Sequence, residues 1–197
     1  MSIEEKIKRI RGPILVLGAG GFIGAALTKT LLRCREDVFG AVLHAPAWRL
    51  GGVPASRIIQ ADLLVDANLD SLFAAVDPKV VFNCVGYGAY PSQTDSDILY
   101  RTNFNLAAKV LQRLAARDTV AYVQLGGPAG RPLDGEYTVS KAAADDLNGY
   151  FGRARNFPGV SLRFGPVYGP PEDASRLVPR IGGSPGLPPE AVYIDDA

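Results

Sequence analysis

Tyr137 and Lys141 stand four residues apart in a segment whose pattern predicts a helix. That spacing places both side chains on one face of the helix, one turn apart. A lysine ammonium in that position favours the tyrosine phenolate, and so lowers the pKa of the phenol from its usual value of about 10. Such a tyrosine can take a proton from a hydroxyl group, or return one, near neutral pH. The alternative is that both residues are ordinary surface residues of a helix.

Three glycines form a second group with chemical meaning. Gly18, Gly21 and Gly24 follow a short apolar run and precede a helical pattern. A glycine-rich turn between a strand and a helix lets backbone N–H groups approach a pyrophosphate at the positive end of the helix. The spacing is G-x-x-G-x-x-G rather than G-x-G-x-x-G, and a glycine-rich loop can also be a simple turn. Its position after the first strand favours dinucleotide binding.

The apolar pattern predicts strands that alternate with helices. Expected strands cover residues 14–17, 38–43, 57–60, 79–84, 120–125 and 160–163, and expected helices cover 21–33, 69–76, 98–116 and 137–151, after a short amphipathic helix over 3–10. Such alternation implies right-handed crossovers and a parallel sheet covered on both faces. We predict an α/β fold with a doubly wound, Rossmann-like parallel sheet over residues 1–160. The proline-rich segment 161–197 is predicted to begin a small substrate-binding region that is incomplete in this chain.

The composition limits the classes of partner. The 197 residues carry a formal net charge of +1, with 21 basic and 20 acidic residues well mixed. There is no basic stripe for nucleic acid and no cationic amphipathic helix for a membrane surface, so we expect a small-molecule partner, no nucleic acid and no membrane. Cys34 and Cys84 have no metal-ligand spacing, and His44 is the only histidine, so no metal site is expected. Nothing near the N-terminus reads as a signal peptide, and we expect a cytoplasmic location.

Five motifs in order resemble the extended short-chain dehydrogenase/reductases, the NAD-dependent epimerase/dehydratase family. They are GAGGFIG, QADL, FNCVG, YTVSK and LRFGPVYGP, with YIDDA as a weaker match, and the resemblance covers about residues 12–197. It implies an NAD(P)-dependent oxidoreductase or epimerase that acts on a nucleotide-linked sugar by hydride transfer. Tyr137 would be the acid/base and Lys141 its activator. The alternative is a non-catalytic dinucleotide-binding protein of the same fold, with a regulatory or scaffold role.

The resemblance also implies binding residues. Asp62 and Leu63 would flank the adenine, and Lys141 would also reach the nicotinamide ribose. Arg163 and Tyr168 would contact the substrate, although an arginine at a strand end can equally form a salt bridge at the sheet edge. The implied cofactor-binding set is Gly18, Gly21, Phe22, Ile23, Gly24, Asp62, Leu63, Cys84, Val85, Gly86 and Lys141.

The choice between NAD and NADP depends on the residues that follow the second strand. A carboxylate there binds the ribose hydroxyls of NAD, whereas an arginine accommodates the extra phosphate of NADP. This chain offers His44 and Arg49 and no acid between them. Both basic residues could also be merely solvated. The sequence favours NADP over NAD.

Asn103 interrupts an apolar stripe. Leu99, Asn103, Leu106, Val110 and Leu114 fall on one face of the helix expected over 98–116. A buried amide needs hydrogen-bond partners. It either makes a structural hydrogen bond to nearby backbone or, as the resemblance implies, joins the catalytic group by supporting the lysine through water.

The chain departs from the family in two respects. The family ends its fifth strand with a serine or threonine beside the tyrosine, whereas this chain has Gly126, Gly127 and Pro128, and loss of such a donor typically costs about 10²–10³-fold in rate. An acidic pair used by the sugar 4,6-dehydratases is also missing from residues 128–130, which disfavours dehydratase chemistry.

Family chains run on well past a segment like YIDDA, so we expect absent loops and an absent C-terminal portion. The family commonly dimerises through the helices expected at 98–116 and 137–151, which predicts a homodimer.

Overall fold

The computed structural model describes residues 1–127, 133–165, 167–169 and 192–193. Its centre is a six-stranded sheet in the order β3-β2-β1-β4-β5-β6, with every neighbouring pair parallel. The strands are β1 (Ile14–Leu17), β2 (Val38–Val42), β3 (Ile58–Gln60), β4 (Val80–Asn83), β5 (Ala121–Leu125) and β6 (Gly159–Leu162). The order turns back between β1 and β4, because Ile14 pairs with both Val38 and Val80. The predicted doubly wound α/β fold is confirmed.

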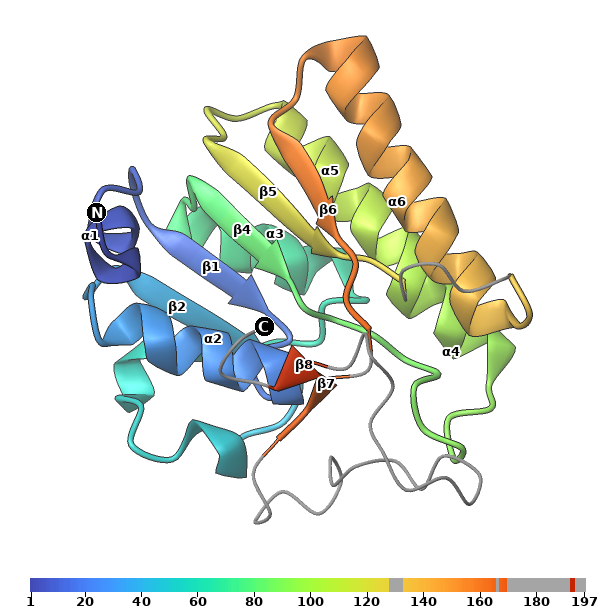
Figure 1. Ribbon diagram of the computed structural model, residues 1–197, viewed down its shortest axis with the longest axis horizontal. Coiled ribbons are helices and arrows are strands. Elements are labelled where there is room, and N and C mark those ends of the chain that lie inside the picture. The colour runs from blue at the N-terminus through green and yellow to red at the C-terminus, as the bar shows by residue number, and fades with distance from the viewer. Residues whose placement is uncertain (128–132, 166, 170–191, 194–197) are drawn as a thin grey trace.

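Helices cover both faces of this sheet (Figure 1). One face carries α1 and α2, and the other carries α3, α5 and α6. The helices are α1 (Ile3–Lys8), α2 (Phe22–Leu32), α3 (Asp66–Val76), α4 (Ser96–Tyr100), α5 (Leu106–Ala115) and α6 (Glu136–Arg155), with the short 3-10 helices η1 (Trp48–Leu50) and η2 (Ala55–Arg57). Two short strands, β7 (Val167–Tyr168) and β8 (Val192–Tyr193), pair in parallel outside the main sheet.

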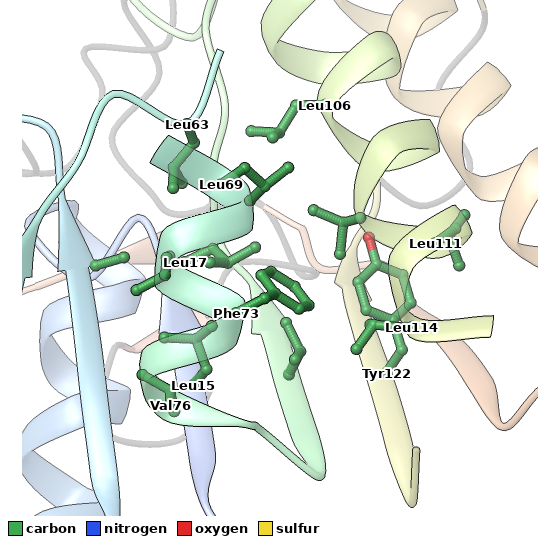
Figure 2. Close-up of a cluster of buried hydrophobic side chains, with 14 of the residues drawn as sticks. Leu15, Leu17, Leu63, Leu69, Phe73, Val76, Leu106, Leu111, Leu114 and Tyr122 are labelled. Atoms are coloured by element: carbon green, nitrogen blue, oxygen red, sulfur yellow. The ribbon is translucent and has the colours of Figure 1, made fainter. Parts of the chain in front are cut away.

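Strand β1 divides the core into two apolar clusters. Leu15 and Leu17 point to one face and Ile14 and Val16 to the other, and all four are fully buried. This is the pattern of a central parallel strand, which is apolar throughout because both of its faces are covered. Figure 2 shows the first cluster, where side chains of β1, α3, α5 and β5 gather. This packing supports the strands whose carboxyl ends form one edge of the sheet.

Helix α1 is joined to the sheet by one buried cation. The side chain of Arg35 is 9 % exposed and forms a salt bridge with Asp37. Its guanidinium also donates to the backbone carbonyls of Ile7, Ile10 and Gly12. The amphipathic helix expected at the N-terminus is therefore present, and it is held at the amino end of β1.

Boundaries differ from the expected ones mainly at α6. This helix starts at Glu136 and continues to Arg155, four residues beyond its expected end, and it stops where Asn156 adopts a left-handed conformation with φ +50°. The expected helix over 98–116 begins earlier, at Ser96, and contains one π-helical turn, η3 (Arg101–Asn105). The proposed division at residue 160 stays a prediction, and 170–191 lie outside the described residues.

Candidate active site

A cleft of about 430 Å³ opens at the carboxyl edge of the sheet, where the order turns back between β1 and β4. In open parallel sheets this switch point is where ligands bind, because the loops leave it in opposite directions. The cleft brings together residues that are far apart in the sequence. Those predicted from the sequence are Gly21, Phe22, Ile23, Arg49, Cys84, Val85, Gly86, Tyr137 and Lys141.

Gly21, Phe22 and Ile23 form one wall of the cleft, and the glycine turn around them is packed too closely for added side chains at Gly18 and Gly24. Gly18 has φ +75°, and a Cβ on it would lie 3.0 Å from the backbone nitrogen of Val85. A Cβ on Gly24 would collide with the carbonyl oxygen of Gly18. Gly21 is the N-cap of α2 and gives the helix no side-chain cap. The first-turn amides of α2 therefore meet the cleft with the partial positive charge of a helix N-terminus.

Lys141 is buried at the floor of the cleft. Its side chain comes from α6, its residue exposure is 3 %, and its Nζ donates to the carbonyl oxygen of Val85 at 3.5 Å. Burial lowers its pKa from 10.5 to about 8, against the opposing effect of the Asp145 charge. Burial also raises the pKa of the Cys84 thiol to about 12, so this sulfur is neutral at physiological pH. Lys141 is consequently a cation that can lose its proton within the working range of an enzyme.

Tyr137 lies one turn before Lys141 on α6 and lines the same cleft. Its ring packs against the backbone of Gly88, where an added Cβ would lie 3.2 Å from Cδ2 of the tyrosine. The shared helix face predicted from the four-residue spacing is therefore present. The structure places a phenol and an ammonium at one cleft.

The side-chain amide of Asn103 uses both its oxygen and its nitrogen in hydrogen bonds. It lies in the π-helical turn η3, is 1 % exposed, and donates to the carbonyl of Tyr87 at 2.8 Å and to Oγ of Ser140 at 3.0 Å. Its Oδ1 accepts from the backbone N–H of Tyr87 at 2.9 Å. Ser140 in turn donates to the carbonyl of Tyr137. Asn103 thereby joins the loop after β4 to helix α6 beside Lys141, and its role in catalysis stays a prediction.

The loop after β4 is also fixed by two other side-chain amides. Oδ1 of Asn83 accepts from the N–H of Val85, and Oε1 of Gln93 accepts from the N–H groups of Gly88 and Tyr90. Tyr90 lines the cleft. Neither Gln93 nor Ser140 was predicted as a site residue, although Ser140 stands beside Lys141 in the YTVSK motif.

The residues assigned to the adenine and its ribose do not all lie in one place. His44 and Asp62 line a second, shallower depression of about 760 Å³ at the ends of β2 and β3. The Asp62 carboxylate accepts from the N–H of Leu64 and is exposed, whereas Leu63 is buried in the core beside α3. Arg49 lines the first cleft and lies over the Trp48 ring at 4.3 Å. The structure therefore separates the two basic residues that the sequence grouped as the ribose end.

Neither of the two candidate substrate residues lines the cleft, although their neighbours Phe164 and Val167 do. Nε of Arg163, just after β6, donates to Oδ2 of Asp145 at 2.9 Å, and half of the Arg163 side chain is exposed. Tyr168 belongs to β7 and is partly buried. Asp145 was not among the predicted site residues. The sequence feature that could have indicated Asp145 is its position four residues, or one helical turn, after Lys141.

Among the residues that the structure describes, no group of three or more His, Cys, Asp or Glu side chains is placed to hold a metal ion. Within the same residues, no helix has the length and apolar content needed to span a membrane. Both cysteines are free thiols.

Comparison with protein families identifies the chain. Residues 14–182 match the model of the NAD dependent epimerase/dehydratase family. The chain belongs to this family. The matched range contains the glycine turn, Tyr137, Lys141 and Arg163, and it covers every residue that lines the cleft. No curated protein matches the sequence.

Solved structures of family type share the fold. The Bordetella bronchiseptica enzyme WbmF, in complex with NAD+ and UDP, is 25 % identical with a TM-score of 0.71, and the match covers 83 % of this chain and 52 % of that one. The Thermus thermophilus UDP-glucose 4-epimerase complex with NAD is 23 % identical with a TM-score of 0.70, covering 81 % and 57 %. The Bacillus cereus UDP-glucuronic acid 4-epimerase in complex with NAD is 23 % identical with a TM-score of 0.65, covering 80 % and 57 %. The chain matches little more than half the length of these proteins.

Proposed function

We propose that this chain is an NAD(P)-dependent oxidoreductase or epimerase that acts on a nucleotide-linked sugar, with Tyr137 as the acid/base. The observation that carries the proposal is that Gly21 of the glycine turn, Tyr137 and Lys141 all line one cleft. A dinucleotide site and a proton-transfer pair have no structural reason to share a cleft unless they serve the same reaction.

The cleft fits a dinucleotide on its own geometry. The close approach of Gly18 to Val85 and the uncapped start of α2 at Gly21 leave backbone amides that a pyrophosphate can accept from. Cys84, Val85 and Gly86 provide the neighbouring wall. When bound, the cofactor would supply a nicotinamide ring that accepts or returns a hydride.

The protein's own part in the reaction is to position a hydroxyl group and move its proton. Tyr137 would take that proton at its phenolic oxygen and return it in the reverse direction. Lys141, charged below a pKa of about 8, would favour the phenolate. Activity should therefore need Lys141 protonated and Tyr137 able to ionise.

A nucleotide-linked sugar is proposed as the substrate because of the family and its relatives. WbmF was solved with NAD+ and UDP, and two of the compared proteins are named as epimerases of UDP-sugars. These proteins extend well beyond the matched range, and a panel of UDP-sugars tests which sugar is used.

The cofactor is proposed to be NAD or NADP, with opposing indications. The compared proteins carry NAD or NADH. Arg49 in the cleft is the residue that favours NADP, because its guanidinium can bind a ribose phosphate. Competition between NADH and NADPH decides between them. Replacement of Arg49 by alanine should weaken NADPH binding and spare NADH binding if the arginine has this role.

A second candidate function is a non-catalytic dinucleotide-binding protein with a regulatory or scaffold role. Gly126, which follows β5 and lines the cleft, and its neighbour Gly127 favour this alternative, because neither can supply a hydroxyl. Residues 128–132, which include the segment 128–130 that lacks the acidic pair of the dehydratases, lie outside the described residues. Both candidate functions require cofactor binding, and only the first requires turnover.

The test has two stages. First, NAD+, NADH, NADP+ and NADPH are titrated by isothermal calorimetry. Second, the protein is incubated with the preferred cofactor and a panel of UDP-sugars, and products are separated by chromatography. Turnover that Tyr137→Phe abolishes with little change in cofactor affinity supports the enzyme. Tight binding without turnover across the panel supports the second candidate, and absence of binding to all four cofactors rejects both.

Two further expectations accompany the proposal. A homodimer through the helices of residues 98–116 and 137–151 is favoured by the exposed side chains of Ile98, Tyr100, Val139 and Tyr150, and sedimentation velocity measures it. The cytoplasmic location stays a prediction from cysteine usage.

A further inference from the structure

Asp145 is a carboxylate buried behind the cleft, outside its lining. Its side chain is 2 % exposed, and it stands on α6 one turn after Lys141 and two turns after Tyr137. A carboxylate removed from water is costly unless opposite charge and hydrogen bonds compensate it. Its location therefore calls for an explanation beyond packing.

Only one of the two carboxylate oxygens has a hydrogen bond within the described residues. Oδ2 accepts from Nε of Arg163 at 2.9 Å, whereas Oδ1 accepts none. The Arg163 side chain is half exposed, so the pair joins a buried carboxylate to a cation that reaches solvent beside β6. Asp145 thereby fixes the one guanidinium that the sequence assigned to the substrate.

Gly126 leaves the room that this carboxylate occupies. A Cβ at Gly126 would lie 2.5 Å from Oδ2 and 2.7 Å from Oδ1 of Asp145. Since Gly126 lines the cleft, the carboxylate lies directly behind the cleft wall. Glycine at this position and the acid at position 145 are therefore matched, and any side chain at 126 would displace the carboxylate.

The titratable groups around Lys141 belong to α6 and to the segment after β4. Cys84 follows β4 and is a neutral thiol, Tyr137 is on α6, and Asp145 is the carboxylate of the same helix. Arg163 follows β6 and forms a salt bridge with Asp145, so its positive charge partly offsets the negative charge of the carboxylate. Burial pushes Lys141 towards the neutral form, and the Asp145 charge opposes this.

We propose that Asp145 is a positioning residue of the active site, which keeps Lys141 charged and holds Arg163 at the end of β6, with Gly126 as its steric complement. The catalytic part of this inference rests on the proposed function, because Lys141 matters to the reaction only if it activates Tyr137. The placement of charge and the fit with Gly126 are independent of any substrate.

The first test compares Asp145→Asn with Asp146→Asn, its exposed neighbour on the same helix. Asparagine keeps the size of the side chain and removes its charge. The titration of Lys141 is followed by NMR of the lysine ¹³Cε signals, assigned by their loss in Lys141→Met. Asp145→Asn should lower the pKa of Lys141 by about 1 unit, whereas Asp146→Asn should not. An unchanged Lys141 titration in folded Asp145→Asn overturns the proposal.

The same pair of variants separates this inference from the proposed function. If turnover exists, the alkaline limb of the kcat profile should move to lower pH in Asp145→Asn, and KM for the sugar nucleotide should rise because Arg163 is released. A shifted Lys141 titration in a protein without turnover supports the electrostatic role and rejects the proposed enzyme. A shifted titration with an unmoved pH profile shows that Lys141 does not control the reaction, and rejects the positioning role in catalysis.

A double-mutant cycle tests the steric match and does not depend on whether Asp145→Asn folds. Gly126→Ala should lower the melting temperature in the natural background, and should lower it much less in an Asp145→Ala background, where the carboxylate is gone. Gly152→Ala on α6 is the matched control, because its Cβ would meet only ordinary contacts. Equal losses from Gly126→Ala in both backgrounds contradict the match of Gly126 with Asp145.

Discussion

The side chains of Asn103 and Ser140 are joined by a hydrogen bond of 3.0 Å, and Ser140 immediately precedes Lys141. Through this bond the π-helical turn η3 touches α6 at the level of the catalytic candidates. Because the same amide holds the backbone of Tyr87, one residue fixes both the helix and the loop that border the cleft.

Replacement of Asn103 by alanine should destabilise the fold by about 2–4 kcal/mol, because buried groups of Tyr87 and Ser140 lose their partners. Urea unfolding measures the loss. Asn105→Ala is the control, since Asn105 lies in the same turn but is exposed. Equal stability of the two variants would show that the Asn103 bonds are replaced by water.

Replacement of Lys141 by methionine should stabilise the protein at neutral pH. The folded state lowers the pKa of Lys141 from 10.5 to about 8, so it binds fewer protons than the unfolded state between these values. The stability that this group contributes is present above pH 10.5 and is lost as the pH falls to 8. Below pH 8 the buried charge costs about 3 kcal/mol, which methionine removes.

Urea unfolding of both proteins at pH 7 and pH 10 checks this dependence. Lys141→Met should be the more stable protein at pH 7, and its advantage should shrink at pH 10. Lys8→Met, at an exposed position on α1, controls for the loss of one positive charge. A Lys141→Met protein that is less stable at pH 7 would show that the ammonium has compensating partners.

Replacement of Gly21 by glutamate should abolish dinucleotide binding while the fold is kept. Gly21 is exposed at the start of α2, and a carboxylate there would compete with the pyrophosphate for the helix N-terminus. Calorimetric titration measures the loss. Ala116→Glu adds the same charge at an exposed site just after α5 and should bind normally. Unchanged affinity in Gly21→Glu would place the cofactor elsewhere.

Replacement of Arg35 by methionine should cost about 2–4 kcal/mol, because three backbone carbonyls lose a charged donor. Lysine at the same position should restore only part of this stability, since an ammonium lacks the planar fork of donors. Hydrogen exchange should show the largest increase in α1. If α1 stays protected in Arg35→Met, its apolar contact through Ile7 is sufficient to hold it.

The sequence predicted the order of strands and helices because each strand of the sheet is an apolar run bounded by turn residues. The glycine turn and the Tyr137–Lys141 pair were also predictable, since local spacing fixes them. The limits of α6 were not, because its last turn depends on packing and on the left-handed residue Asn156.

The remaining parts of the site depend on contacts between distant segments. No local pattern showed that Asn103 would bind the loop at Tyr87, or that Gly126 faces Asp145 across the end of β5. Leu63 was assigned to the adenine by its motif and its apolar side chain is buried beside α3, a contact that spacing alone did not predict. Sequence spacing reports which residues share one element, and the sheet decides which elements meet.

The amino edge of the parallel sheet offers a practical handle. Arg35 holds α1 beside Gly12, ahead of β1, so the exposed Met1 emerges at the edge opposite the cleft (Figure 1). An affinity tag or a biosensor anchor placed there would present the cleft to the bulk solution in a uniform orientation. Surface-based cofactor measurements can therefore use this terminus without obstructing the nucleotide entrance.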